Sequence, residues 1–193
     1  YTVLADAPAH QQASASVTVS GSSETHDLAL DGAVENTDTG DSWTAIQPAV
    51  DAATSGETIT VAPGTYAESV DFASVSGETD LTLTSTGAAS ETVIVGQGSV
   101  PTFNVNADST TIDGFTITGS GPGLLVNTFD TTQHTVRNNI VQASGEQVGV
   151  NIGETVSVTD NEITSSSLEA TGIKLYDGGA SGTTITGNEV TGF

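Results

Sequence analysis

From residue 58 onward the chain alternates apolar and polar residues in short runs, which glycine, asparagine, aspartate and proline separate. Thr58-Ile59-Thr60-Val61, Leu81-Thr82-Leu83 and Val93-Ile94-Val95 are examples. Alternation with a period of two is typical of a β-strand with one buried face, whereas these runs are too short for a helical period. The sequence therefore predicts a train of short strands joined by turns.

Four of these runs repeat one pattern: Ile112–Ile117, Val136–Val141, Val158–Ile163 and Ile185–Val190. Their first residues lie 24, 22 and 27 positions apart, which is enough chain for three short strands and three bends. Stacking such circuits ~4.8 Å apart pairs the backbones and aligns equivalent side chains. The repeat therefore predicts an all-β fold, a parallel β-helix. Its inward columns are expected to be Ile112, Val136, Val158 and Ile185; Leu124, Val150 and Ile173; and Val126, Ile152 and Leu175.

One regular column is polar and contains Asn139, Asn161 and Asn188, with Phe115 at the same position of the first repeat. Asparagine tolerates tight bends, and its amide can bond both to the bend and to the asparagine above it. A structural asparagine ladder is the favoured interpretation. A simple turn preference of asparagine is the alternative.

The region before the repeats predicts a short capping helix. Trp43, Ile46, Val50 and Ala53 fall on one helical face, and Asp41-Ser42 offers an N-cap. Because Pro48 cannot donate a hydrogen bond within a helix, the regular helix is expected to begin near Pro48 and to end at Gly56. Its expected task is to cover the apolar end of the stacked coils.

Residues 1–40 are rich in small and polar residues and only weakly patterned, except for a strand-like segment, Ala15–Ser20. An arm that pairs with a neighbouring subunit and a flexible leader are both open. The predicted organisation is an N-terminal arm over 1–40 and a parallel β-helix over 41–193.

The repeat and its asparagine column resemble the right-handed parallel β-helix of the pectin-lyase-like superfamily. The segment Ala45–Tyr66 resembles the N-terminal cap and first coil common in that superfamily, so the resemblance covers residues 41–193. Right-handedness is implied by the resemblance alone. Because the superfamily includes lyases, hydrolases, epimerases, tailspikes, adhesins and surface proteins, the resemblance does not fix an activity.

The chain has 24 acidic and two basic residues, and its formal net charge is −22. Regularly spaced Val, Ile and Leu argue against disorder. The charge repels nucleic acid and anionic membranes. Strong self-repulsion is tolerable near 1 M salt, where the Debye length is about 3 Å. The composition resembles proteins of extreme halophiles and suggests a haloarchaeon or its virus; a dedicated calcium-binding acidic protein is the alternative.

Other features concern location. The chain contains no cysteine, and no apolar run approaches the ~18 residues of a membrane span. It opens at Tyr1, and a small-residue stretch, Leu4–Ala9, follows. A removed leader and a trimmed sequence both explain this start. We expect an extracellular or cell-surface protein.

The search for chemistry starts from the two basic residues, Arg137 and Lys174. The resemblance implies that a polyuronate lyase would use Asp-bound calcium and a basic residue that removes a proton. Arg137 should lie one rung above Asp113, either as an exposed ion pair or as part of a ligand site. Lys174 should stack above Asn151, with Tyr176 nearby, as a binding patch or as surface decoration.

No catalytic residues and no metal site are assigned. The sequence has no Asp-Asp pair of the kind glycoside hydrolases of this fold need, and it lacks Met, Cys or clustered His as copper ligands. Glu162 and Glu189 share a column and either repel or share a cation. No cofactor is expected beyond non-specific cations, with Ca²⁺ possible at such acidic positions.

The last predicted rung, from Ile185 to Phe193, has no polar cap. An exposed apolar cross-section with unpaired backbone groups favours further chain or another subunit as a cover. Together with the arm, this favours a non-catalytic structural protein that self-associates as a filament subunit, surface-layer component or fibre. A polysaccharide-binding or -cleaving protein of the pectate-lyase kind is the alternative, and whether the protein is an enzyme stays open, with the sequence leaning against it.

Overall fold

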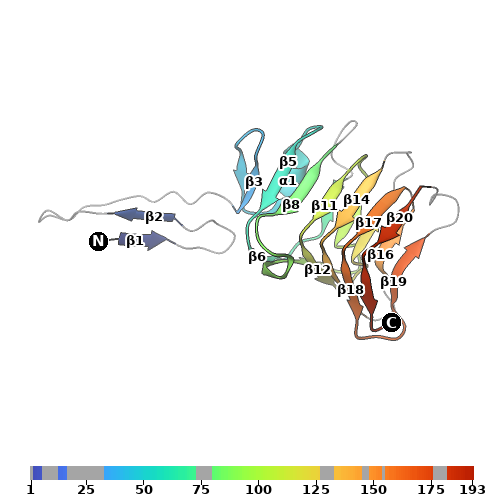
Figure 1. The fold of residues 1–193 in the computed structure, drawn as a ribbon. Coiled ribbons are helices and arrows are strands. Elements are labelled where there is room, and N and C mark those ends of the chain that lie inside the picture. The colour runs from blue at the N-terminus through green and yellow to red at the C-terminus, as the bar shows by residue number, and fades with distance from the viewer. Residues whose placement is uncertain are drawn as a thin grey trace, which may run out of the picture.

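The computed structural model describes residues 2–5, 13–16, 33–72, 80–126, 133–144, 148–153, 155–175 and 182–193. From residue 58 the chain winds as a right-handed parallel β-helix, and each complete circuit contributes one strand to each of three sheets (Figure 1). The predicted fold class is confirmed. We call the layer formed by one circuit a rung.

The first sheet, sheet 1, contains in spatial order β4 (Ser42–Trp43), β3 (Val34–Asn36), β5 (Thr58–Val61), β8 (Thr82–Ser85), β11 (Thr111–Asp113), β14 (His134–Arg137), β17 (Val156–Thr159) and β20 (Thr184–Thr186). Sheet 2 contains β6 (Gly64–Tyr66), β9 (Thr92–Gly96), β12 (Thr116–Gly119), β15 (Ile140–Ala143), β18 (Glu162–Ser165) and β21 (Glu189–Thr191). Sheet 3 contains β7 (Val70–Asp71), β10 (Phe103–Val105), β13 (Leu124–Val126), β16 (Val148–Ile152) and β19 (Thr171–Leu175). A 3-10 helix, η2 (Ala89–Glu91), precedes β9.

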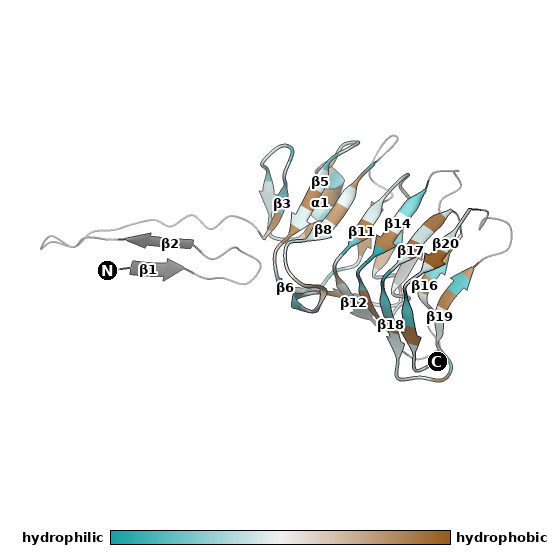
Figure 2. Ribbon diagram, in the orientation of Figure 1, coloured by the Kyte–Doolittle hydropathy of each residue, from teal (hydrophilic) through white to brown (hydrophobic). Residues whose placement is uncertain are grey.

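The backbone register confirms the predicted columns. Ile112 pairs with Val136, Val136 with Val158 and Val158 with Ile185, and the two columns of sheet 3 are in register as well. Apolar and polar residues alternate along these strands, as Figure 2 shows. The interior is therefore a stack of aliphatic layers, because every second side chain of each strand points inward.

Three phenylalanines fill the interior of neighbouring circuits. The rings of Phe72 and Phe103 are 6.3 Å apart, those of Phe103 and Phe115 are 6.0 Å apart, and both pairs are tilted. All three side chains are fully buried. Tilted aromatic pairs at this distance add about 0.5–1.5 kcal/mol each to the area that they bury.

The predicted capping helix exists as α1 (Ile46–Ala52), but its ends differ from the expectation. Asp41-Ser42 is not the N-cap, since Ser42 lies in β4 and the helix begins at Ile46. The backbone N–H groups of Ile46 and Gln47, in the first turn of α1, donate to the two oxygens of the Glu68 carboxylate at 2.8 and 3.0 Å. Pro48 is tolerated because it lies in the first turn, where its missing N–H is not needed.

The helix also ends earlier than expected, at Ala52 rather than at Gly56. Its apolar face is buried against the first coils: Ile46, Ala49 and Val50 are fully inaccessible to solvent. Helix α1 therefore packs over the apolar end of the first coils, as the sequence predicts.

The sheet edges at this end are closed as well. β3 and β4 add antiparallel strands to sheet 1, although residues 34–36 belong to the segment that the sequence assigns to the arm. On sheet 3, the Gln47 side-chain amide accepts from Asp71 N at 2.7 Å and donates to Asp71 O at 2.9 Å. The side-chain amide of Gln47 thus satisfies the backbone groups of Asp71 that a further strand would otherwise pair. Sheet edges with unpaired backbone groups tend to associate with other chains, and this contact closes part of the edge.

Within the arm, β1 (Thr2–Ala5) and β2 (Ala13–Ser16) pair antiparallel. The strand expected over Ala15–Ser20 is described only as far as Ser16. Residues 17–20 lie outside the described residues.

Candidate functional site

A two-residue bend joins sheet 1 to sheet 2 in successive rungs. Its first residue has a positive φ: 83° at Gly114, 55° at Asn138, 55° at Asp160 and 69° at Gly187. Glycine, asparagine and aspartate are the residues that adopt this left-handed conformation at least cost. The bend turns the chain sharply and places the next residue, including Asn139, Asn161 and Asn188, inside the corner.

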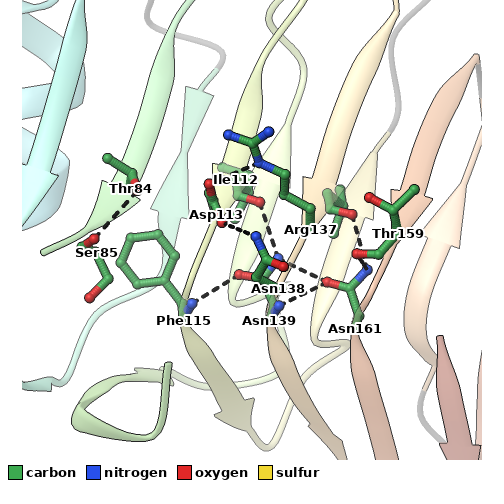
Figure 3. Close-up of polar contacts among 11 residues, drawn as sticks. Thr84, Ser85, Ile112, Asp113, Phe115, Arg137, Asn138, Asn139, Thr159 and Asn161 are labelled. Carbon is green, nitrogen blue, oxygen red and sulfur yellow. Dashed lines mark hydrogen bonds and ion pairs between the residues drawn. The ribbon is translucent and has the colours of Figure 1, made fainter. Parts of the chain in front are cut away.

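The corner asparagines are hydrogen-bonded from rung to rung (Figure 3). Asn139 Nδ2 donates to Asn161 Oδ1 at 3.1 Å, and Asn161 Nδ2 donates to Asn188 Oδ1 at 2.9 Å. The same oxygens accept from the backbone N–H groups of Asn139 and Asn161 at 3.0 and 2.9 Å. Asn139 and Asn161 are almost fully buried, so their amides satisfy buried backbone groups rather than bind a ligand.

The ladder ends at Phe115, in the rung that precedes Asn139. Phe115 N donates to Asn139 Oδ1 at 3.0 Å, while its ring joins the aromatic stack of the core. The column thus changes from polar to aromatic at Phe115, whose backbone N–H still donates to the asparagine of the next rung.

Asp113 and Arg137 face outward on sheet 1 and form an ion pair beside this ladder (Figure 3). Arg137 Nε lies 2.8 Å from Asp113 Oδ2, and Asn138 Nδ2 donates to Asp113 Oδ1 at 2.8 Å. The side chains of Arg137 and Asp113 are 50% and 18% exposed. Both oxygens of Asp113 are engaged, and an ion pair this exposed contributes about 0–1 kcal/mol to stability.

The other expected ligand residues lie elsewhere. Asn151 and Lys174 are adjacent in register on sheet 3, Asn151 buried and Lys174 exposed. Tyr176 lies outside the described residues. The structure therefore brings Asp113 and Arg137 together on one sheet and Asn151 and Lys174 together on another, and does not form one site from the two pairs.

No metal centre is apparent in the described part of the chain, where no group of three or more His, Asp or Glu side chains is placed to hold an ion. Glu162 and Glu189 are adjacent in register, as their column predicts, and both are exposed. Two exposed carboxylates fall short of the six to eight oxygen ligands typical of Ca²⁺.

The comparisons with known proteins address the fold. Residues 101–193 match a protein-family model described as "Right handed beta helix region". The matched segment comprises β10 through β21, which includes the whole asparagine ladder. No curated protein gives a significant match. Among the described residues, no helix is both long enough and apolar enough to cross a membrane.

Sequence reasoning missed a buried histidine. His134 is fully buried at the start of β14, and its Nδ1 accepts from Thr110 N at 3.2 Å. Burial lowers the pKa of His134, and the nearby Asp108 carboxylate opposes this effect only in part. The position shares an inward column with Val156, which is a signal that could have revealed it.

Sequence reasoning also missed a polar groove on sheet 2. It has a volume of about 380 Å³ and is lined by Thr118, Gln142, Ala143, Ser144, Thr164, Ser165 and Ser166. Its floor consists of outward positions of β12, β15 and β18, which the sequence indicates only as polar.

Proposed function

We propose that this chain is a non-catalytic extracellular structural protein that assembles through the C-terminal end of its β-helix. There β19, β20 and β21 are the last strands of the three sheets, and we call these three strands together the last rung. The observation that carries the proposal is apolar exposure on that rung: Leu175, Ile185 and Val190 are 48%, 42% and 45% exposed. The residues directly beneath them are fully buried: Ile152, Val158 and Ile163. Covering such side chains stabilises an assembly by roughly 25 cal/mol per Å² of apolar area removed from water.

The opposite end of the β-helix is a poor receptor for this rung. Helix α1 covers the apolar core at that end, and β3 and β4 extend sheet 1 in the antiparallel direction. The side chain of Gln47 is hydrogen-bonded to the backbone of β7 at Asp71. Head-to-tail stacking would have to displace these elements. The proposed partner is therefore the same rung of a second copy.

Contact between identical rungs is consistent with two-fold symmetry. The outer edges of β19, β20 and β21 are unpaired within the described residues. Around a two-fold axis perpendicular to the β-helix axis, one strand meets its own copy and the other two meet each other's copies. All of these strand pairs are antiparallel, so their N–H and C=O groups can pair. This arrangement closes at a dimer, so the proposal favours a discrete dimer as the building unit over an open filament formed by the solenoid alone.

The net charge makes such an assembly dependent on salt. Two copies that each carry a formal charge of −22 repel each other strongly. At about 0.01 M salt the Debye length is about 30 Å, whereas at about 1 M it is about 3 Å. We expect association at high ionic strength, which is the environment that the acidic composition suggests.

Sedimentation equilibrium of residues 1–193 at these two salt concentrations tests the proposal. Ile185→Asp should give a monomer at high salt, because it places a charge in the interface while costing little in a monomer, where the side chain is exposed. Thr186→Asp is the matched control, since it adds the same charge to the outward face of the same strand, and it should leave the dimer intact. A wild-type monomer at every salt and protein concentration overturns the proposal, and so do open-ended filaments.

A further coil of a longer gene product would cover the same side chains. The measurement is therefore repeated on the complete gene product, where only association with a second copy depends on protein concentration. A concentration-independent monomer in which residues 175, 185 and 190 are protected from solvent would refute self-association.

Cleavage of polyuronates is the weaker alternative. It requires a basic residue free to remove a proton from an anionic substrate. Arg137 Nε donates to one oxygen of the Asp113 carboxylate, and Asn138 Nδ2 donates to the other oxygen. This pairing favours a structural role for the residues that the sequence had suggested for a ligand site on sheet 1.

A further inference from the structure

The backbone of the last rung presents its hydrogen-bonding groups in a regular pattern. Successive residues of a β-strand direct their N–H and C=O groups to opposite edges. In sheets 1 and 2 the outward residues face the preceding rung, because the N–H groups of Thr135 and Glu189 donate to carbonyls of that rung. The inward residues of these two sheets therefore face the following rung. On the last rung they are Ile185 in β20 and Val190 in β21.

Sheet 3 leads to the same pattern. Its inward residue Phe103 donates its N–H to a carbonyl of the following rung, and Phe103 shares a column with Ile173 in β19. Ile173, Ile185 and Val190 therefore direct their backbone groups toward the open edge of the β-helix. The outward residues beside them direct theirs back toward the preceding rung.

This pattern restricts how a second copy can pair with the last rung. Opposite residues of an antiparallel pair place their side chains on the same face, and they alternate between hydrogen-bonded and non-hydrogen-bonded pairs. An inward residue of one copy must therefore lie opposite an inward residue of the other. The outward residues then form the non-hydrogen-bonded pairs, in which the Cα atoms approach to ~4.5 Å.

Charge distinguishes the three strands through which the two-fold axis can pass. Lys174, the only lysine of a chain with a net charge of −22, is outward and exposed on β19, and Glu189 is outward and exposed on β21. Neither β19 nor β20 carries an acidic residue, so Lys174 meets one only where β19 faces β21 of the other copy. That requires the axis to pass through β20. Opposite charges across an antiparallel pair are favourable, whereas like charges are unfavourable.

On the basis of the dimer proposed above, we propose that its two-fold axis passes through β20 and that Lys174 of each copy pairs with Glu189 of the other. The pairing of Ile173 with Val190 of the other copy sets these two charged residues opposite each other. The ammonium group of Lys174 has three N–H donors, so it can make this contact and keep contacts within its own chain.

The remaining contacts of this arrangement are complementary as well. On the axis, Ile185 lies opposite Ile185 of the other copy, and Thr184 lies opposite Thr186, which is a favourable cross-strand pair. Where β19 faces β21, the same register sets Leu175 opposite Asn188. The ladder directs the N–H of each corner asparagine toward the following rung, as that of Asn161 shows, so the Leu175 carbonyl supplies an acceptor for Asn188 N.

Single cysteines test the position of the axis, because the chain contains none. The Cα atoms of a disulfide lie ~4.4–6.8 Å apart, a range that includes the closely opposed residues of an antiparallel pair. Under oxidising conditions at about 1 M salt, a mixture of Lys174→Cys and Glu189→Cys should form a disulfide-linked dimer, whereas neither variant alone should. Thr135→Cys, on the outward face of β14, is the control for random collisions and should not cross-link with Lys174→Cys.

Charge reversal tests the ion pair, at the lowest salt concentration at which the wild type dimerises. Lys174→Glu should weaken the dimer about tenfold, because each dimer exchanges two opposite-charge pairs for two like-charge pairs. Adding Glu189→Lys should restore the affinity, since it re-forms both pairs with their charges exchanged. Adding Asp80→Lys instead gives the same net charge at an exposed position near β8, far from the last rung, and should not restore it.

The outcomes separate this arrangement from the dimer itself. A disulfide formed by Lys174→Cys alone or by Glu189→Cys alone would place the axis at β19 or β21, and would overturn the arrangement while keeping the dimer. The same conclusion follows if the mixed variants still sediment as dimers under reducing conditions but never cross-link, or if Lys174→Glu leaves the affinity unchanged. A wild-type monomer at every salt concentration overturns the proposed function, and this arrangement with it.

Discussion

The asparagine ladder gives the sharpest stability prediction, at its central member. Asn161 Nδ2 donates to Val136 O at 3.0 Å and to Asn188 Oδ1 at 2.9 Å, and Asn161 Oδ1 accepts from Asn139 N and Asn139 Nδ2. Asn161→Ala removes all of these bonds at a corner where both Asn139 and Asn161 are buried. The backbone groups Asn139 N and Val136 O then lose partners that the corner leaves little room for water to replace.

The magnitude follows from those two stranded groups. A buried donor or acceptor left without a partner costs about 1–3 kcal/mol. Two of them, with small further losses from the amide-to-amide bonds, predict that Asn161→Ala lowers the free energy of unfolding by about 3–5 kcal/mol. Asn188→Ala should cost less, because Asn188 is partly exposed and water can reach the groups that it serves.

Urea unfolding at high salt, extrapolated linearly to water, measures both variants. The two-state assumption is checked by comparing circular dichroism with Trp43 fluorescence, because repeat proteins can unfold in parts. A loss below about 1 kcal/mol for Asn161→Ala would refute the idea that the ladder stabilises the corner, since a turn preference alone would predict such a small effect. Equal losses for Asn161→Ala and Asn188→Ala would refute the role assigned to burial.

Three further predictions concern other parts of the fold. Glu68→Gln should destabilise the protein by about 1 kcal/mol, because the charged carboxylate at the start of α1 caps two N–H groups, and urea unfolding measures it. Since the pKa of His134 is lowered in the folded state, the unfolded chain binds more protons, so stability should fall as the pH drops below about 6.5 and level off below the folded pKa. Unfolding curves of wild type and His134→Gln across this range check it, and an unchanged slope in the variant would contradict it. Arg137→Ala should cost at most about 1 kcal/mol at low salt and less at high salt, so a larger loss would mean that the Asp113 pair stabilises more than its exposure allows.

The sequence predicts the β-helix well because the fold is built from local repetition. A period of two within runs and a near-constant spacing between them determine which side chains share a column, and Ile112, Val136 and Val158 lie where this reasoning places them. The bend is equally local: a residue that tolerates positive φ precedes each corner asparagine, as at Asn138 and Asp160. Such features need no knowledge of distant contacts.

The structural features that the sequence does not predict arise from contacts between residues that lie far apart in the chain. The cap of α1 comes from Glu68, which lies 22 residues after Ile46 in the sequence, so the nearer Asp41-Ser42 is a misleading signal. Likewise, the pairing of Val34 with Val61 joins a weakly patterned segment to sheet 1. The exposure of Ile185 agrees with the predicted lack of a cap on the last repeat, but a repeat does not define what stacks on its last member.

The polarity of the ladder constrains whatever covers the last rung. In each step the asparagine oxygen of one rung accepts from the backbone N–H of the rung before it, as Asn188 Oδ1 does for Asn161 N. Among the described residues, no hydrogen bond engages Asn188 N in the same way. A partner that seals this end must therefore supply an acceptor at the corner as well as apolar side chains over Ile185 and Val190. An interface that covered the apolar side chains but lacked this acceptor would bury an unsatisfied N–H, which costs about 1–3 kcal/mol. If a second copy is the partner, substitutions that move acceptors near this corner should change the dimer's dissociation rate even where they leave the apolar contact untouched.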